Sequence, residues 1–168
     1  MIIIYTGNGK GKTSASTGQA IRAIGQNKKV AFGQFFKPAH QAGEQKILAE
    51  LLADNFFPHG SGFYFGEEEK FAQQRSLALE LLNWAKTKAG KCFMLVLDEA
   101  LYALESKLLS EQELKGLVEL CRENNTHLVL SGRGLPAWLV EEADLISEIN
   151  EIKHPFYSGQ KAQAGIEF

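Results

Sequence analysis

The sequence contains few cysteines, and the two that it has lie far apart. Cys92 and Cys121 are the only cysteines among 168 residues, and neither has a second cysteine or a histidine at metal-ligand spacing. This pattern excludes a disulfide framework and a zinc site of the usual spacing. We expect both thiols to be buried in the core.

An excess of one charge is also absent. The chain has 18 Lys and Arg residues against 20 Asp and Glu residues, for a net charge of -2, and its basic residues are spread along the sequence. A nucleic-acid-binding domain usually carries a concentrated basic patch. We therefore expect no nucleic acid among the partners.

Long hydrophobic runs are missing as well. The opening "MIIIYTG" holds three consecutive isoleucines, with no basic segment before them and no extended apolar stretch after them. Such a run is too short for a signal peptide or a membrane span. The expected location is cytoplasmic, with no membrane association.

The apolar residues that are present, 45% of the chain, occur in short runs separated by longer amphipathic segments. This alternation is typical of an α/β fold in which helices cover both faces of a sheet. The continuous runs "FMLVLD" and "HLVLS" predict strands buried on both sides in a mostly parallel sheet. A single domain over residues 1–168 is expected. The predicted strands are residues 2–5, 29–35, 92–98, 127–131 and 145–149.

Two longer helices are predicted from their periodicity. Apolar residues recur at helical spacing from Phe71 to Ala85, which indicates a helix of about six turns. Ser110 and Glu113 have the spacing of a capping box, so a second helix is expected to begin there and to end near residues 123–125. Residues 56–69 are predicted to be a long irregular loop. The buried stripe of the second helix is expected to comprise Leu114, Leu117, Val118 and Cys121.

The stretch "YTGNGKGKTSAS" is a glycine-rich loop between a predicted strand and a predicted helix. Glycines let backbone N–H groups approach an anion, and the helix adds its positive end. Lys12 would supply a charge to phosphate oxygens, and Thr13 a hydroxyl to a phosphate-bound magnesium ion. A turn with chance lysines is the alternative, but it leaves the flanking strand and helix unexplained. The predicted nucleotide-binding residues are Gly7, Asn8, Gly9, Lys10, Gly11, Lys12, Thr13 and Ser14.

Two carboxylates follow the strand in "CFMLVLDEA". Asp98 and Glu99 are expected at the edge of the sheet where the phosphate loop lies, because parallel strands end at the same edge. There they would complete a magnesium site with Thr13. The alternative is an acidic helix N-terminus without a ligand role.

Two further stretches leave alternatives open. Arg133 in "LVLSGRGLP" follows a strand and would clamp a polyphosphate, or it is a solvated loop arginine. Phe63 and Phe65 in "GSGFYFGEEE" belong either to the core or an edge strand, or to a site for a broad, flat, apolar ligand. A phosphate loop with this acid pair fits a nucleotide hydrolase with Glu99 as base, a kinase, or another transferase.

Over nearly its whole length, the sequence resembles the P-loop ATP:corrinoid adenosyltransferases. The resemblance is carried by "YTGNGKGKTSAS", "KKVAFGQFFKP", "GEQKIL", "GFYF", "MLVLDEALYAL", "LSGRGLP", "EEADLISEI" and the tail "KHPFYSGQKAQAGIEF". It implies a P-loop NTPase-like α/β fold and an enzyme that transfers the 5′-deoxyadenosyl group of ATP to the Co(I) centre of a reduced corrinoid, releasing triphosphate. A nucleotide- or corrinoid-binding module without turnover is the non-catalytic alternative.

The resemblance also implies roles for particular residues. Lys12, Thr13, Glu99 and Arg133 would be catalytic, with Thr13, Glu99 and Asp98 holding Mg²⁺. Phe63 and Phe65 would contact the corrinoid and displace its lower axial ligand. The implied partners are ATP, cob(I)alamin or a cobinamide-type corrinoid, an electron-donating reductase such as a flavoprotein, and a second copy of the chain in a homodimer.

Two departures from the family pattern stand out. The usual P-loop has a glycine where this chain has Thr6, and its first glycine, Gly7, comes one residue later. We relate this to the family's triphosphate, which lies across the loop in the direction opposite to that in other P-loop enzymes. Family members also commonly carry an N-terminal extension that helps to cover the corrinoid, whereas this sequence starts at the first strand. Either this cover is missing, or another segment or a partner subunit is expected to supply it.

Overall fold

The protein is built on one parallel sheet, as seen in a computed structural model that describes residues 1–167. Its six strands lie in the order β3-β2-β4-β5-β1-β6, and every neighbouring pair is parallel. The strands are β1 (Ile2–Thr6), β2 (Val30–Phe35), β3 (Phe56–His59), β4 (Met94–Asp98), β5 (His127–Ser131) and β6 (Leu145–Glu148). The predicted α/β fold with a parallel sheet is confirmed.

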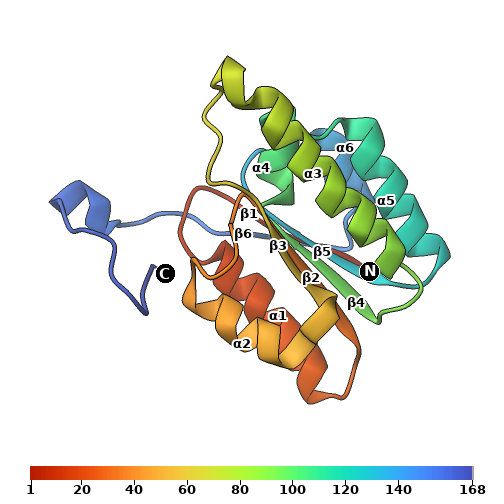
Figure 1. Cartoon of the computed structure of the whole chain (residues 1–168). Coiled ribbons are helices and arrows are strands. Elements are labelled where there is room, and N and C mark those ends of the chain that lie inside the picture. Colours follow the sequence, from red (N-terminus) through yellow and green to blue (C-terminus); the bar gives the residue numbers. More distant parts are fainter. Residues whose placement is uncertain (168) are drawn as a thin grey trace.

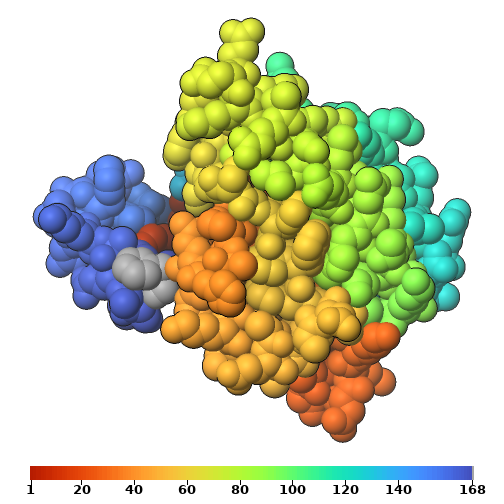
Figure 2. Space-filling view, viewed as in Figure 1, coloured from red at the N-terminus to blue at the C-terminus, as the bar shows by residue number. Residues whose placement is uncertain are grey.

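Helices cover both faces of this sheet, as predicted (Figure 1). On one face lie α1 (Lys12–Gly25) and α2 (Gly43–Leu52), followed by a short 3-10 turn, η1 (Ala53–Asn55). On the other face lie α3 (Glu68–Lys88), α4 (Ala100–Glu105), α5 (Glu111–Glu123) and α6 (Ala137–Glu142). A second 3-10 turn, η2 (Pro155–Ser158), lies in the C-terminal segment, which stands at the side of the body (Figure 2).

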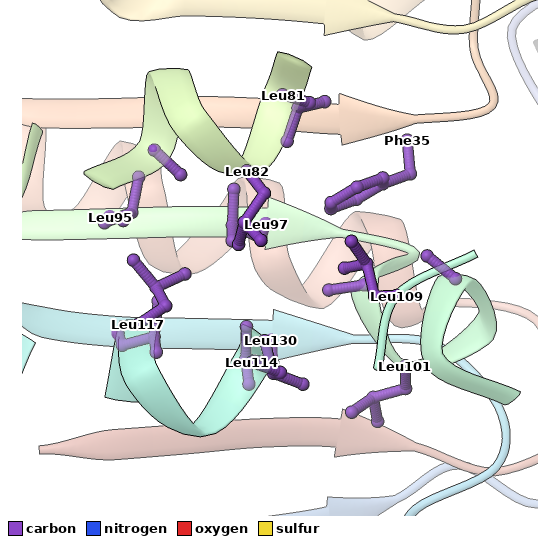
Figure 3. Close-up of a cluster of buried hydrophobic side chains, with 14 of the residues drawn as sticks. Phe35, Leu81, Leu82, Leu95, Leu97, Leu101, Leu109, Leu114, Leu117 and Leu130 are labelled. Atoms are coloured by element: carbon purple, nitrogen blue, oxygen red, sulfur yellow. The ribbon is translucent and has the colours of Figure 1, made fainter. Parts of the chain in front are cut away.

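The core has two layers because the central strands bury side chains on both faces. Alternate residues of β4, Leu95 and Leu97, pack with Leu81 of α3 and Leu117 of α5 (Figure 3). The intervening Val96 packs on the α1 and α2 side. Full burial on both faces explains why the apolar runs of these strands do not alternate with polar residues.

Most of the predicted elements are found, and one is corrected. The helix predicted from Ser110 is α5; the Ser110 hydroxyl accepts from Glu113 N, and the predicted stripe is buried. Both cysteines are buried. The loop expected at residues 56–69 is wrong in part, because it contains β3 and the start of α3. The strand β3 was missed because it is short and contains Pro58, a residue that argues against a central strand. Proline is tolerated here because β3 is a four-residue edge strand beside β2.

Because all six strands are parallel, the loops that follow them gather at one edge of the sheet. That edge carries the loop after β1, Phe36 and Lys37 after β2, Glu99 after β4 and Arg133 after β5. Among residues 1–167, no helix is both long and apolar enough to cross a membrane.

Candidate active site

The glycine-rich loop joins β1 to α1, as the sequence predicted. Gly7 and Gly11 have φ of 102° and 117°, a backbone conformation that favours glycine. A Cβ at Gly7 or Gly9 would lie 2.4 or 2.8 Å from Ile149 O, and Gly9 N–H donates to that oxygen at 2.8 Å. These two glycines are thus needed for contact with the chain after β6, and Gly9 N–H already has a partner within the protein.

Lys12 lies folded against this loop. Its Nζ donates to Gly7 O at 2.8 Å and to Gly9 O at 2.9 Å, and the residue is buried. Burial lowers the pKa of Lys12, against the raising effect of Glu99. An ammonium held by two carbonyls at the start of a helix is well placed to exchange them for phosphate oxygens.

The acids after β4 meet the start of α1. Thr13 Oγ1 donates to both carboxylate oxygens of Asp98 at 3.1 Å, and Ser131 Oγ donates to Asp98 Oδ1 at 2.6 Å. Glu99 N donates in turn to Ser131 Oγ at 3.0 Å. The predicted residues Thr13, Asp98 and Glu99 are therefore brought together from two separate segments, and Ser131 of β5 bonds to both acids.

The two carboxylates differ in environment. Asp98 is fully buried among hydrogen-bond donors, whereas Glu99 is half-buried and lines the pocket described below. Burial and the charge of Asp98 raise the pKa of Glu99 to about 6, despite the opposing cations Lys12 and Lys37. Glu99 also has a left-handed backbone, with φ of 63°, where β4 turns into α4. Of the two carboxylates, Glu99 is therefore the one whose side chain is accessible to a ligand in the cavity.

Sequence reasoning missed a polar network at the end of β2. Lys37 Nζ lies 3.1 Å from Asp98 Oδ2, 3.2 Å from Glu44 Oε1 and 3.4 Å from Thr13 Oγ1. Gln34 Nε2 reaches the same two carboxylates, at 3.3 Å and 3.2 Å. Burial lowers the pKa of Lys37, but Asp98 and Glu44 outweigh it, so the pKa is raised overall.

Phe63 and Phe65 lie on an aromatic cluster at this edge. The Phe63 ring stacks on Phe36 with centroids 5.7 Å apart and an interplanar angle of 3°, and it contacts Tyr102 at 6.0 Å. Tyr102 Oη donates to Tyr64 O at 2.6 Å, which ties the segment to α4. Phe63 is 48% exposed and Phe65 80% exposed. The rings of Phe63 and Phe65 are thus exposed to solvent, and the Phe63 ring packs on the buried ring of Phe36.

One cavity of about 760 Å³ joins these parts. The predicted residues that line it are Asn8, Gly9, Lys10, Gly11, Lys12, Thr13, Ser14, Phe63, Phe65, Glu99 and Arg133. Asp98 lies beneath it, bonded to Thr13, and Gly7 accepts from Lys12. Arg133 is exposed and donates to Asn8 O at 3.4 Å. The predicted nucleotide, metal and aromatic residues therefore share one site.

The C-terminal segment closes one side of the cavity. His154 and residues 165–167 line it, and Lys10 Nζ pairs with Glu167 Oε1 at 2.8 Å. Lys10 is thus paired with a carboxylate, although the sequence pattern assigned it to the nucleotide. The tail that carries much of the family resemblance lies against the phosphate loop.

The donor set at this edge fits a small divalent cation. Within residues 1–167, no group of three or more His, Cys, Asp or Glu side chains is placed to hold a metal ion. Thr13 and the two carboxylates instead supply hydroxyl and carboxylate oxygens, the ligands that Mg²⁺ takes when nucleotide phosphates and water complete its shell. The residues therefore match a nucleotide-bound magnesium ion better than an all-protein metal centre.

Comparison with protein families matches residues 1–168 to the family described as ATP:corrinoid adenosyltransferase BtuR/CobO/CobP. A corrinoid adenosyltransferase of Sinorhizobium sp is 35% identical over 174 residues, covering 100% of this chain and 80% of that protein. One from Escherichia coli (strain K12) is 34% identical over 171 residues, covering 100% and 85%. The corrinoid adenosyltransferase CobA of Salmonella typhimurium is 32% identical over 169 residues, again covering 100% and 85%.

Similarity to solved structures occurs at lower identity. The genome packaging NTPase B204 from Sulfolobus turreted icosahedral virus 2 superposes with a TM-score of 0.55 at 17% identity, covering 92% of this chain and 76% of that one. A replication initiator DnaA structure matches with a TM-score of 0.49 at 15% identity, and this chain spans 40% of its length. The packaging NTPase supports a P-loop NTPase-like fold for this chain.

Proposed function

The chain belongs to the ATP:corrinoid adenosyltransferase family, and from this premise we propose how its own residues divide the reaction. The protein is an enzyme of ATP-dependent adenosyl transfer to a corrinoid. The observation that carries the division of roles is the single cavity that contains both the phosphate loop and the exposed Phe63 and Phe65. Two large substrates that must react with each other need such a shared site.

In the proposed reaction, the Co(I) centre of the substrate corrinoid donates an electron pair to the 5′ carbon of ATP. The cobalt–carbon bond forms as the bond from that carbon to the triphosphate oxygen breaks, and triphosphate leaves with the electron pair. No proton moves, so no general base is needed. The lining supplies the cations Lys12, Lys37 and Arg133, which can receive a charged leaving group without any proton transfer.

The phosphate loop is proposed to stabilise the leaving group. Triphosphate carries about four negative charges as it departs, and cations fixed around it lower the barrier. Lys12 and Arg133 are the proposed contacts. Their support is that Lys12 Nζ already lies among loop carbonyls and that Arg133 is exposed at the rim of the same cavity.

Magnesium is the proposed cofactor, held by Thr13 with Glu99 and Asp98. When bound, the ion would neutralise charge on the phosphates. The contribution of this chain is to place the hydroxyl of Thr13, in the first turn of α1, beside two carboxylates at the end of β4. Ser131 and Lys37 hold Asp98 in turn, at 2.6 and 3.1 Å.

The aromatic pair is proposed to receive the corrinoid. Phe63 rests on buried Phe36, so it presents a fixed apolar face, and Phe65 extends the surface outward. Rings held in this way can press on the lower face of a corrinoid and displace its axial ligand, which makes Co(II) easier to reduce. We also propose that the protein forms a homodimer and is cytoplasmic. A flavoprotein or other reductase is the proposed electron donor.

The test is an anaerobic incubation of the purified protein with magnesium, ATP and chemically reduced cob(I)alamin. Visible spectra would follow a light-sensitive alkylcobalamin, and phosphate analysis would identify the released anion. Adenosylcobalamin with stoichiometric triphosphate is expected. Orthophosphate without a new cobalt–carbon bond would instead indicate a hydrolase with Glu99 as base, and binding of both substrates without product would indicate a non-catalytic module.

A further inference from the structure

The lysine after β2 has only one role in the division given above, which is to hold Asp98. Lys37 lines the cavity beside Thr13 and Glu99, and its ammonium lies between the carboxylates of Asp98 and Glu44. Its side chain is 17% exposed. It is therefore a largely buried cation at the bottom of the proposed leaving-group site, additional to the lysine of the phosphate loop.

The backbone that carries Lys37 is tightly fixed. Phe36 has φ of 62° and is buried under Phe63, and a Cβ at Gly60 would lie 2.2 Å from the Phe36 carbonyl carbon. Gly62 N–H donates to Phe36 O at 2.8 Å, and Lys37 N–H donates to Phe35 O at 2.8 Å. The position of the Lys37 ammonium is consequently set by its own side chain, not by movement of the loop.

The ammonium now lies where a divalent cation would compete with it. Lys37 Nζ is 3.4 Å from Thr13 Oγ1 and 3.1 Å from Asp98 Oδ2, so it contacts two of the three proposed magnesium ligands. Two cations repel each other across such a short distance. The four-carbon stem of lysine lets its ammonium turn away from a fixed backbone position. On the cavity side, a polyphosphate held by the loop would receive it once magnesium occupies the carboxylates.

We propose that Lys37 is a second triphosphate ligand, whose ammonium leaves Asp98 and binds the leaving group when the magnesium–nucleotide complex enters the cavity. This inference deepens the proposed function and rests on its assignment of the cavity to triphosphate. Glu44 then has a distinct role, because it holds the ammonium near the site when the anion is absent.

The direct test measures the affinity for inorganic triphosphate with Mg²⁺ by calorimetry, which needs no corrinoid. Lys37→Met keeps an apolar stem without the charge, and is expected to weaken triphosphate binding at least tenfold. Lys37→Arg is expected to restore most of the affinity, because it keeps the cation. Lys46→Met removes an exposed lysine of α2 and is the matched control, with unchanged binding.

Glu44→Gln separates this role from a structural one. This substitution removes the carboxylate that pairs with the Lys37 ammonium and leaves the charge of Lys37 in place. Triphosphate binding is therefore expected to equal or exceed that of the wild type. Wild-type affinity in Lys37→Met, alongside a lowered melting temperature, would overturn the proposal and leave Lys37 as a structural partner of Asp98. Should Lys37→Met fail to fold, weakened binding in Glu44→Gln would overturn it instead.

Activity distinguishes this proposal from the function on which it rests. If the wild type adenosylates cob(I)alamin but Lys37→Met binds triphosphate normally, only the role of Lys37 is wrong. If the wild type forms no adenosylcobalamin, the proposed function fails, and the triphosphate titrations still decide whether Lys37 binds the anion.

Discussion

Glu99 is the carboxylate of the cavity whose ionisation is most strongly opposed. Burial and the neighbouring Asp98 raise its pKa to about 6. In the unfolded chain a glutamate titrates near 4.3, so between these values the folded protein holds a proton that the unfolded chain has lost. The stability from this proton is present below about pH 4.3 and is lost as the pH rises through about 6.

Replacing Glu99 by Gln should therefore change the free energy of unfolding in a pH-dependent way. Relative to the wild type, Glu99→Gln is expected to gain up to about 2 kcal/mol between pH 4.5 and pH 8, since one pKa unit corresponds to about 1.4 kcal/mol. Urea denaturation at several pH values, without nucleotide or magnesium, measures this. A difference that is independent of pH would contradict the assigned environment.

Phe65 is the most exposed aromatic of the proposed corrinoid surface, at 80%. If its ring displaces the lower axial ligand, Phe65→Ala should slow turnover from cob(II)alamin far more than turnover from pre-reduced cob(I)alamin, because only the former needs the ligand removed. Phe93→Ala is the control, since Phe93 is also exposed but precedes β4 at the other edge of the sheet. Equal losses on both substrates would count against the ligand-displacing role.

The residues of the cavity were predictable to the extent that they belong to short motifs. The phosphate loop, Asp98, Glu99 and Arg133 were found because each lies at or just after the end of a predicted strand. Lys37 follows one too, in "QFFKP", so the same rule applied to that strand would have found it. Glu44 carries no such signal, because it reaches the site from α2 through a contact that only the fold creates.

The packing of α3 on α5 includes an ion pair that joins the two helices. Arg75 donates to both carboxylate oxygens of Glu113, at 2.6 and 2.8 Å, while Glu113 also accepts from the Ser110 backbone N–H. The Arg75 hydrogen bonds lower the pKa of Glu113 to about 2. This stabilisation is present above the unfolded pKa near 4.3 and is lost as the pH falls toward 2.

Glu113→Gln is therefore expected to destabilise the protein by about 1–2 kcal/mol at pH 7, after allowance for partial solvent screening. The effect should shrink as the pH falls below 4, where the wild-type carboxylate itself begins to protonate. Glu111→Gln on the same helix turn is the control: its pair with Lys115 is exposed, so a loss below about 0.5 kcal/mol is expected. Denaturation curves that show equal losses of stability for both variants would contradict a stabilising role for the Arg75–Glu113 ion pair.

The helices and strands differed in how well they could be predicted from the sequence. The 13 residues of α5 were predictable from a capping box and a repeating stripe. By contrast, α4 and α6 have six residues each, too few to establish a period, and β3 combines four residues with a proline. The strand order was not predictable either, because pairing of β1 with β5 and β6 is a long-range choice that local patterns do not encode.

The two core layers share one sheet, so the molecule should unfold as a unit. The strands that pack against α1 also pack against α5, and the cavity is lined by loops from both halves of the chain. Calorimetry is expected to show one cooperative transition. Mg²⁺ and ATP at about 100 times their dissociation constant should stabilise the folded state by about 2.7 kcal/mol.

For a chain of this length, that gain corresponds to an increase of roughly 5–11 °C in the melting temperature. The whole transition should move, because the proposed nucleotide site includes residues of α1 and of the ends of β2 and β4, which are hydrogen-bonded to one another. Lys12→Met is the comparison, since it should melt as one unit but respond weakly to ATP. Two separate transitions, or a shift confined to part of the unfolding enthalpy, would show that residues 1–168 are not one cooperative domain.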